Sequence, residues 1–225
     1  MTKVVAVSAN PALVNGVEDF LSSVSHGRDN SADKFIEMAD HLTDRMLSLF
    51  LVEPSRMVKL TGTQQKVIDF AVTTAGKASH MLTRQIFKKT TNEQFAPIVR
   101  NIDEMYWRPG ADNDNHPMMA VNLDPTLAAN FLRAADLCEA GEGKANINMV
   151  TQALDDLADV IINDFFVANT REVKIGFVTQ KALNLGVDGS RKAIHAVSKK
   201  VLAGLDDKHL RDYMAHYRPL VRDRH

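Results

Sequence analysis

Apolar side chains recur every three or four residues along most of the chain, which is the spacing of an amphipathic helix. The first such stripe follows Asn10-Pro11 and ends at Gly27, and a second runs from Ser31 toward Pro54. Asn10 is a favourable N-cap because its side chain can accept a hydrogen bond from an early backbone amide, and proline suits the first helical position. Both stripes are therefore predicted to be helices.

Two further helices begin with capping boxes, in which a threonine is followed three residues later by a glutamine. Thr61 and Gln64 open one of them, and Thr91 and Gln94 open the next. Behind the first box, residues 67–86 carry a narrow stripe of small apolar side chains. Such a stripe favours close packing against another helix.

The second half of the chain has the same kind of pattern. Asp124-Pro125 restarts a helix, and residues 147–165 form the most regular apolar stripe in the sequence. A long helical stretch follows, with predicted interruptions at Gly186 and Gly189, because glycine lowers helix stability. Asp206 caps a final helix.

The remaining segments are short or aperiodic. Val4 to Val7 is the stretch that reads as a strand, and residues 108–123 contain two prolines and no period, which predicts a loop. We therefore expect an all-α fold, a multi-helix bundle of roughly seven to nine helices with a short extended N-terminal arm. Residues 1–225 are expected to form a single helical domain, which the loop could instead divide into 1–107 and 124–225. The sequence contains no internal repeat at the periods of about 20–50 residues that solenoids use.

Composition is that of an ordinary globular protein, with 45% hydrophobic and 24% charged residues. A chain of this length buries enough surface to fold without a metal or a disulfide. Its single cysteine, Cys138, cannot form an intramolecular bridge, which is typical of a reducing compartment. The apolar run at the N-terminus is too short for a signal peptide, and no apolar run reaches the length of a membrane span. We therefore expect a cytoplasmic protein with no membrane contact and no cofactor.

The formal net charge is −1, but the charges alternate along the chain. Segments 1–55 and 111–170 carry −4 and −8, whereas segments 56–110 and 171–225 carry +5 and +6. The simplest interpretation is that acidic and basic segments face each other inside the fold or across a dimer. The alternative is a basic C-terminal face that meets an acidic partner or a phosphate backbone.

Sequence motifs of the common catalytic sites are absent. The chain contains no G-x-x-x-x-G-K-[ST] phosphate loop, no G-x-G-x-x-G turn, no H-E-x-x-H pair and no G-x-S-x-G elbow. One cysteine cannot build a structural zinc cluster. These absences favour a protein that is not an enzyme.

The segment Ser79-His80-Met81, with the residues up to Ile86, resembles the phospho-accepting helix of histidine kinases and phosphotransferases. In those proteins an exposed histidine on a bundle helix attacks a phosphoryl group, and a neighbouring base keeps its ring nitrogen reactive. The resemblance implies phosphotransfer through His80 as an alternative function. The acidic residue expected after the histidine is replaced by Met81, and no nucleotide-binding motif follows.

Three side chains of the last predicted helix, His209, Asp212 and His216, are spaced so that they share one side of it. Imidazole and carboxylate groups at that spacing could hold a divalent metal with a further ligand from elsewhere. A polar edge of an interface explains the same pattern without a metal, and it is the interpretation that we favour.

Aromatic and methionine side chains flank the predicted loop. Tyr106, Trp107 and Arg108 precede its main part, and Met118 and Met119 lie near its end. Aromatic residues and methionine are common anchors of adaptable protein contacts. They fill cores as well, so these residues are predicted either to anchor a partner or to pack inside the fold.

Together these patterns favour a non-catalytic regulatory or adaptor protein that binds a macromolecular partner through helix faces and the 108–123 loop. The partner is expected to be a protein. The stripes at 67–86 and 147–165 also predict a homodimer, because each suits pairing with another helix.

Alternatives to the adaptor function use other features of the chain. His80 would carry histidine phosphotransfer. The basic segment 171–225 would bind nucleic acid, with Lys199 and Lys200 as contact residues. A small-ligand pocket within the bundle, lined by some of the ten methionines, is a further alternative.

Overall fold

The computed structural model describes residues 2–110 and 116–224. It is 75% helical and confirms the predicted multi-helix bundle with an extended N-terminal segment. The first half of the chain contains, in order, β1 (Thr2–Ser8), α1 (Pro11–Ser25), α2 (Ser31–Leu47), α3 (Glu53–Met57), α4 (Gly62–Phe87), α5 (Asn92–Met105) and β2 (Tyr106–Trp107). The second half contains β3 (Met118–Asn122), α6 (Pro125–Glu139), α7 (Ile147–Ile161), α8 (Ala168–Arg171), α9 (Phe177–Lys200), α10 (Asp207–Tyr217) and β4 (Val221–Arg224).

The two halves are structural repeats of each other. Each consists of a strand, two helices, a short helix, two more helices and a strand, and equivalent residues lie about 115 positions apart. Phe50 is equivalent to Phe165 in this way, and His80 to His195. Several buried positions of α4 recur at the same spacing in and directly after α9. A search at solenoid periods misses a duplication this long.

A four-stranded sheet joins the repeats in the order β2-β3-β1-β4. The equivalent strands β1 and β3 pair antiparallel, with Ala6 opposite Ala120. β4 pairs with the other edge of β1, and β2 pairs with the other edge of β3. Each repeat therefore supplies its last strand to the first strand of the other repeat. Exchanging the repeats gives the same strand order read from the other edge. This is expected for an approximate two-fold axis that passes between the residue pairs Val5–Val121 and Ala6–Ala120.

The sequence pattern indicates one strand, whereas residues 2–110 and 116–224 contain four. β3 lies inside the 108–123 segment that the pattern assigns to a loop, so that part of the prediction is wrong. Four of the five residues of β3 are buried, on both faces of the strand, so the segment lacks the polar alternation that marks a half-exposed strand. Residues 111–115 of the segment lie outside the described residues.

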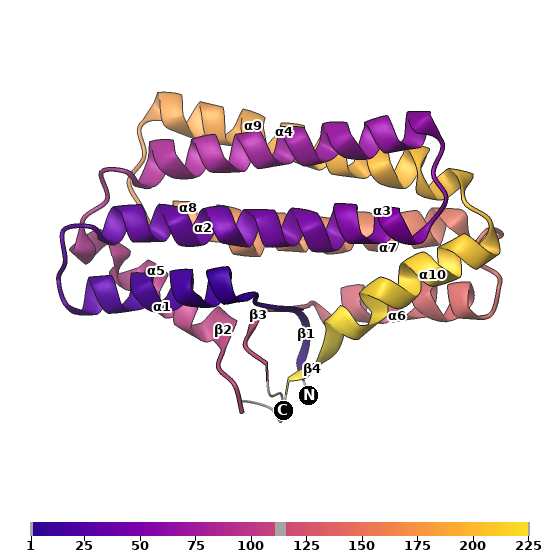
Figure 1. The fold of residues 1–225 in the computed structure, drawn as a ribbon, viewed down its shortest axis with the longest axis horizontal. Helices are drawn as coiled ribbons and strands as arrows, with labels where there is room; N and C mark the ends of the chain where they lie inside the picture. The colour runs from indigo at the N-terminus through magenta and orange to yellow at the C-terminus, as the bar shows by residue number, and fades with distance from the viewer. Residues whose placement is uncertain (1, 111–115, 225) are drawn as a thin grey trace.

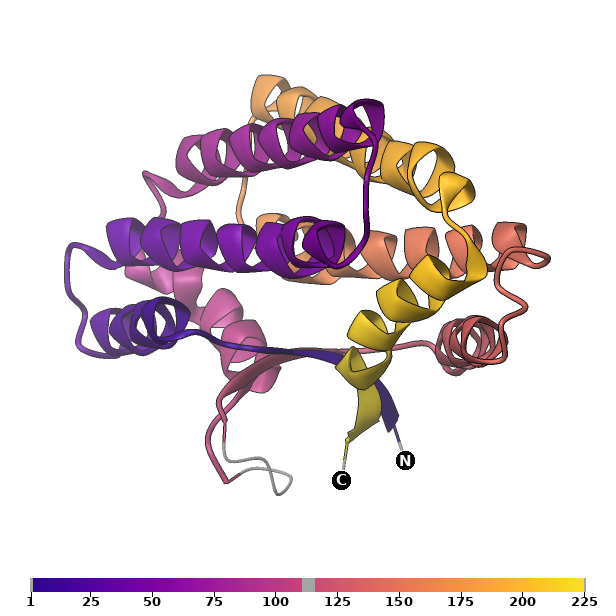
Figure 2. The ribbon, with the colours of Figure 1, turned by 45° about the vertical axis from the view of Figure 1, so that its right-hand side comes forward.

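Figures 1 and 2 show how the helices are layered. α4 and α9 lie side by side in the outermost layer, and α2 and α7 lie beneath them. The sheet and the helices α1, α5, α6 and α10 form the opposite side. The Gln64 side chain donates a hydrogen bond to the Val201 carbonyl at 3.2 Å, which ties the start of α4 to the end of α9. The two outer helices are therefore antiparallel.

α2 and α7 each end in a π-helical turn, over Ser48–Val52 and Ile162–Val167, before the short helices α3 and α8. A π-turn widens the helix locally, and such turns are frequent at functional sites. The equivalent residues Phe50 and Phe165 lie in these turns. The turns are thus a shared feature of both repeats.

α9 runs without interruption from Phe177 to Lys200, so the predicted breaks at Gly186 and Gly189 are wrong. Gly186 serves close packing instead, because a Cβ atom at this position would lie 2.5 Å from Leu82 Cδ1. Carbon atoms that are not bonded pack best at about 3.5–4.0 Å, so the added atom would clash. The absence of a side chain at Gly186 therefore lets α9 approach α4.

The repeat equivalent of this contact joins Ala71 and Val197, which belong to one buried cluster. Ala71 has one carbon atom more than Gly186, and Val197 has one carbon atom fewer than Leu82. The two side chains of each contact thus occupy nearly the same total volume, although the volume is shared differently between them.

One hydrophobic core cluster extends through both halves, from Val5 and Leu13 of the first to Tyr213 and Val221 of the second. The apolar side chains of the two repeats therefore pack in a shared core. In the part of the chain that the structure describes, no helix is both long and apolar enough to cross a membrane.

We expect Gly186→Ala to lower the free energy of unfolding by roughly 1–3 kcal/mol, because the added methyl group overpacks the contact with Leu82. Gly189→Ala on the same helix meets no atom within 4 Å, so it should raise that free energy by up to about 1 kcal/mol through helix propensity. Urea denaturation measures both.

The double variant Gly186→Ala/Leu82→Val rebuilds the pairing of Ala71 with Val197 and should recover most of the lost stability. A Gly186→Ala variant that is as stable as Gly189→Ala would mean that α4 and α9 pack less closely than described.

Candidate functional site

The layer formed by α4 and α9 is basic on both helices. Residues 62–89 contain five Lys or Arg residues and one acidic residue, and residues 177–200 contain the same numbers. These segments therefore carry +8 in a chain whose net charge is −1. Lys66 and its repeat equivalent Lys181 are both exposed. Two basic segments that are far apart in the sequence thus meet in one layer, whose outer surface we call the α4–α9 face.

The α4–α9 face also carries exposed apolar side chains. Those that are more than half exposed are Phe70, Met81, Phe177, Val178 and Leu185, with Phe177 the most exposed at 83%. Phe70 and Leu185 are repeat equivalents. Single exposed apolar residues are normal on proteins, but several on one face indicate an interaction surface.

A basic cleft lies at one end of this face. Its lining includes Arg84, Lys88, Lys89 and Lys174, together with Gly176 at the start of α9. Gly176 is the N-cap of α9 and gives the first backbone amides no side-chain hydrogen bond. These amides and the helix dipole add to the positive potential of the four cations. The cleft therefore suits a carboxylate or another anion.

His80 on α4 lies between two carboxylates of α2. Its Nδ1 is 3.3 Å from Asp40 Oδ1, and its Nε2 is 3.2 Å from Asp44 Oδ1. Each ring nitrogen thus faces an acceptor, and a phosphoryl group on either nitrogen would meet a carboxylate. The geometry favours a structural link between α4 and α2 over nucleophilic attack.

The second repeat contains the equivalent link between α9 and α7. His195 Nε2 and Arg191 Nε each lie 3.2 Å from Asp159 Oδ1. Ser198 Oγ donates a hydrogen bond to Asp155 Oδ1 at 2.6 Å. Acidic side chains of α2 and α7 therefore meet the inner side of the basic layer in both repeats.

Burial raises the pKa of the equivalent carboxyls Asp40 and Asp155 above the ordinary value. The charge of His80 opposes this effect at Asp40, and the hydrogen bond from Ser198 opposes it at Asp155. Desolvation is the larger effect at both positions, so each ionised carboxylate lowers the stability of the fold at neutral pH.

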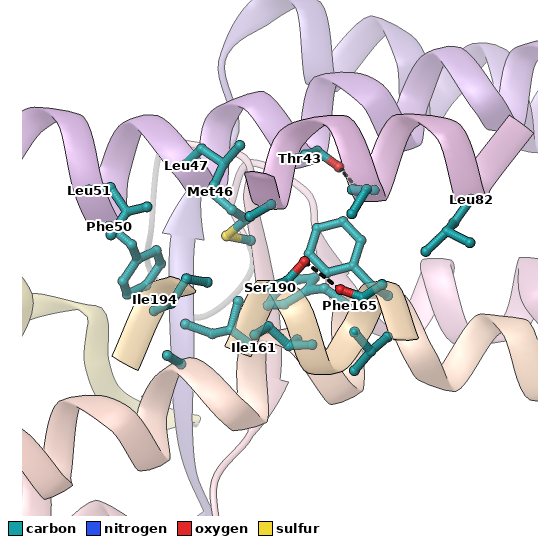
Figure 3. A pocket seen from close by; sticks show the side chains of 18 of the residues that line it. Thr43, Met46, Leu47, Phe50, Leu51, Leu82, Ile161, Phe165, Ser190 and Ile194 are labelled. Atoms are coloured by element: carbon teal, nitrogen blue, oxygen red, sulfur yellow. Dashed lines mark hydrogen bonds between the residues drawn. The ribbon is translucent and has the colours of Figure 1, made fainter. Parts of the chain in front are cut away.

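Beneath the outer layer lies a cavity of about 140 Å³. Side chains of α2, α4, α7 and α9 line it, and so do Phe50 and Phe165 of the π-turns. Figure 3 shows Met46, Leu82 and Ile161 around the same space, each from a different helix. None of the described side chains that line the cavity is charged.

Asn169 of α8 is a polar member of this lining with unmet hydrogen-bonding capacity. The residue is 3% exposed, its Nδ2 donates weakly to the Phe165 carbonyl at 3.4 Å, and its Oδ1 has no hydrogen-bond partner among the described residues. A buried oxygen without a partner costs about 1–3 kcal/mol. Because the repeat equivalent of Asn169 is Pro54, the fold does not require an amide there.

The aromatic and methionine residues around the 108–123 segment lie in the sheet. The sequence predicted that they either anchor a partner or fill the core. Tyr106 and Trp107 form β2, Met118 and Met119 begin β3, and none is more than 7% exposed. Core packing describes their positions, and contact with a partner would require the sheet to open. Arg108 has a half-exposed side chain whose guanidinium lies over the Tyr106 ring, 5.3 Å from its centroid.

The sequence offered two interpretations of the charge pattern: acidic segments that face basic ones, or a basic face that is free for a partner. In the layer of α4 and α9, the first applies to the inner side and the second to the outer side. The carboxylates of α2 and α7 lie on its inner side, next to His80 and His195. Lys199 and Lys200 are exposed at the end of α9. They are thus accessible to a partner.

The metal candidates of α10 have separate hydrogen-bond or ion-pair partners. His209 Nδ1 lies 2.7 Å from Asp206 Oδ1, Asp212 pairs with a lysine one turn earlier, and His216 Nε2 lies 2.8 Å from the Leu49 carbonyl oxygen. Within the described part of the chain, no group of three or more His, Cys, Asp or Glu side chains could hold a metal ion.

Comparison of the chain with protein-family models, curated proteins and solved structures gives no match. The α4–α9 face, the basic cleft and the cavity are the features of the structure that suit binding.

A pocket lined by methionines was one alternative from the sequence, and Met46 lines the cavity. Motif reasoning missed the other cavity residues and the pairing of the two basic helices. The signal that could have found them is the offset of about 115 residues, which aligns Phe50 with Phe165 and Lys77 with Lys192. The same alignment sets Asn169 against a proline and so marks it as a departure from the repeat.

We expect Asp155→Asn to stabilise the protein at neutral pH. The raised pKa means that the folded state binds more protons than the unfolded state just above pH 3.8, so stability falls as the pH rises through this window. Asparagine has no charge to desolvate and can still accept from Ser198. The stability gain over wild type should therefore grow from pH 3 to pH 7, as measured by chemical denaturation at each pH.

Asp156→Asn removes the neighbouring carboxylate and controls for the loss of one negative charge. A gain from Asp155→Asn that is equal at all pH values, or a loss at neutral pH, would contradict the desolvation argument.

Proposed function

We propose that this protein is a non-catalytic adaptor whose α4–α9 face binds an acidic protein partner. The observation that carries the proposal is that segments 62–89 and 177–200, which contain α4 and α9, carry +8 together with several exposed large apolar side chains. Positive charge attracts and orients an acidic partner, and apolar side chains supply contact area that water would otherwise cover.

An amphipathic helix with one acidic side fits this face. α4 has 26 residues and is about 39 Å long, which is enough to contact several turns of a third helix. Two antiparallel helices present a groove into which the apolar side of such a helix can pack. Met81 and Leu185 would contact its apolar side, while Lys88 and Lys89 of the basic cleft would meet its carboxylates.

Nucleic acid is the second candidate partner, because Lys192, Lys199 and Lys200 add to the positive charge along α9. The exposed apolar side chains favour a protein over a duplex. Phosphates would attract the lysines, but they would leave Phe177 and Val178 in contact with water. A protein helix can cover both kinds of side chain.

The homodimer expected from the apolar stripes has less support than a different partner. Residues of the 67–86 stripe pack on α9 of the same chain, and residues of the 147–165 stripe belong to the shared core. Two copies joined through the α4–α9 face would bring positive charge against positive charge. The buried Cys138 agrees with a cytoplasmic location as part of the proposal.

The test uses three fluorescent probes and measures binding by anisotropy. The first is a synthetic helical peptide with leucine on one side and glutamate on the other. The second is a scrambled peptide of the same composition, and the third is a DNA duplex. We expect the amphipathic peptide to bind more tightly than the other two probes. Its affinity should fall as the salt concentration rises. Lys88→Glu/Lys89→Glu should weaken the binding of this peptide about tenfold, because the two exposed ion pairs together contribute about 1.4 kcal/mol.

Lys208→Glu/Arg211→Glu is the matched control, because it reverses two exposed charges on α10, away from the face. It should leave the affinity for the amphipathic peptide unchanged. Met81→Ser tests the apolar contribution. It should lower the affinity for the amphipathic peptide more than the affinity for the scrambled peptide. Equal binding of both peptides, or binding of the duplex alone, would overturn the proposal, and the second outcome would favour the nucleic-acid function.

A further inference from the structure

The lining of the cavity beneath α4 and α9 comes from both repeats in equivalent pairs. Met46 corresponds to Ile161, and Phe50 corresponds to Phe165. The members of these two pairs are apolar, so duplication of the fold by itself supplies apolar side chains to the cavity from both repeats. Polar groups without an equivalent are additions to that lining.

Several hydroxyl groups of the lining form hydrogen bonds within the protein. Thr43 Oγ1 and Ser79 Oγ share a hydrogen bond of 2.8 Å, and Ser190 Oγ donates to the backbone carbonyl one turn earlier at 2.9 Å. Tyr217 Oη donates to the Phe50 carbonyl at 2.6 Å. Asn169 differs from them, because its Oδ1 is an acceptor without a partner among residues 2–110 and 116–224.

We propose that the cavity binds a small neutral molecule that donates a hydrogen bond to Asn169 Oδ1. The volume of about 140 Å³ is close to that of engineered apolar cavities, about 150 Å³, that stay dry and bind benzene. The ligand is therefore an apolar molecule the size of one six-membered ring with a hydroxyl or amine group. This site is separate from the α4–α9 face and does not depend on a partner there.

The chemistry of the lining sets the ligand class. A charged ligand would be desolvated without a countercharge, because no charged side chain lines the cavity in the described residues. A ligand that only accepts hydrogen bonds would leave the oxygen unpaired, because the Asn169 Nδ2 already points to the Phe165 carbonyl. A donor on an apolar ring satisfies both conditions.

Phenol and fluorobenzene test the proposal, because they have nearly the same size and only phenol donates a hydrogen bond. Isothermal titration calorimetry gives the dissociation constant of each with the full-length protein. We expect wild type to bind phenol at least as tightly as fluorobenzene, although water solvates phenol better. Asn169→Leu should lower the preference for phenol about tenfold, which is the effect of one hydrogen bond.

Asn184→Leu, at an exposed position of α9, is the matched control and should keep the wild-type preference. The comparison of the two ligands on wild type decides the question even if Asn169→Leu does not fold. Wild type that binds neither ligand, or that binds fluorobenzene more tightly than phenol, overturns the proposal. An unchanged preference in Asn169→Leu overturns it as well.

Discussion

The antiparallel packing of α4 against α9 is the contact on which the rest of the structure depends. Both helices are basic, so their charges repel, and the apolar contacts between them have to outweigh that repulsion. Gly186 lets the helices approach closely at Leu82, and Ala71 has the same role at the equivalent place near Val197. The carboxylates of α2 and α7 relieve the charge on the inner side only. The positive potential therefore remains on the outer side, where a partner can meet it.

The two-fold arrangement explains both what is shared and what differs between the repeats. β1 pairs with β3 on the axis, and each repeat supplies a strand to the other, so neither half can complete the sheet by itself. The equivalent π-turns bring Phe50 and Phe165 to one cavity from opposite repeats. Symmetric elements thus build the framework. The distinct chemistry arises where symmetry is broken, at Asn169 opposite Pro54 and in the basic cleft around Lys88 and Lys89.

The α4–α9 face and the cavity lie on opposite sides of the same two helices. Leu82, which lines the cavity, is one residue away from the exposed Met81. A group in the cavity contacts both repeats, because side chains of α4 and α9 line it together. Binding there would stabilise the packing that presents the outer face, in proportion to the occupancy of the cavity.

The sequence by itself determined the helical class, most helix starts and the alternation of acidic and basic segments, because apolar period, capping residues and charge are local properties. Asn10, Thr61, Asp124 and Asp206 begin helices as their chemistry predicts. Only the tertiary structure decided that α4 pairs with α9, that β3 forms within a segment without a period, and that Tyr106 and Trp107 are buried. It also brought Asn169 to an apolar cavity and both basic helices to one face. These features join residues that are far apart in the chain, and their geometry depends on packing between the repeats, which no local pattern records.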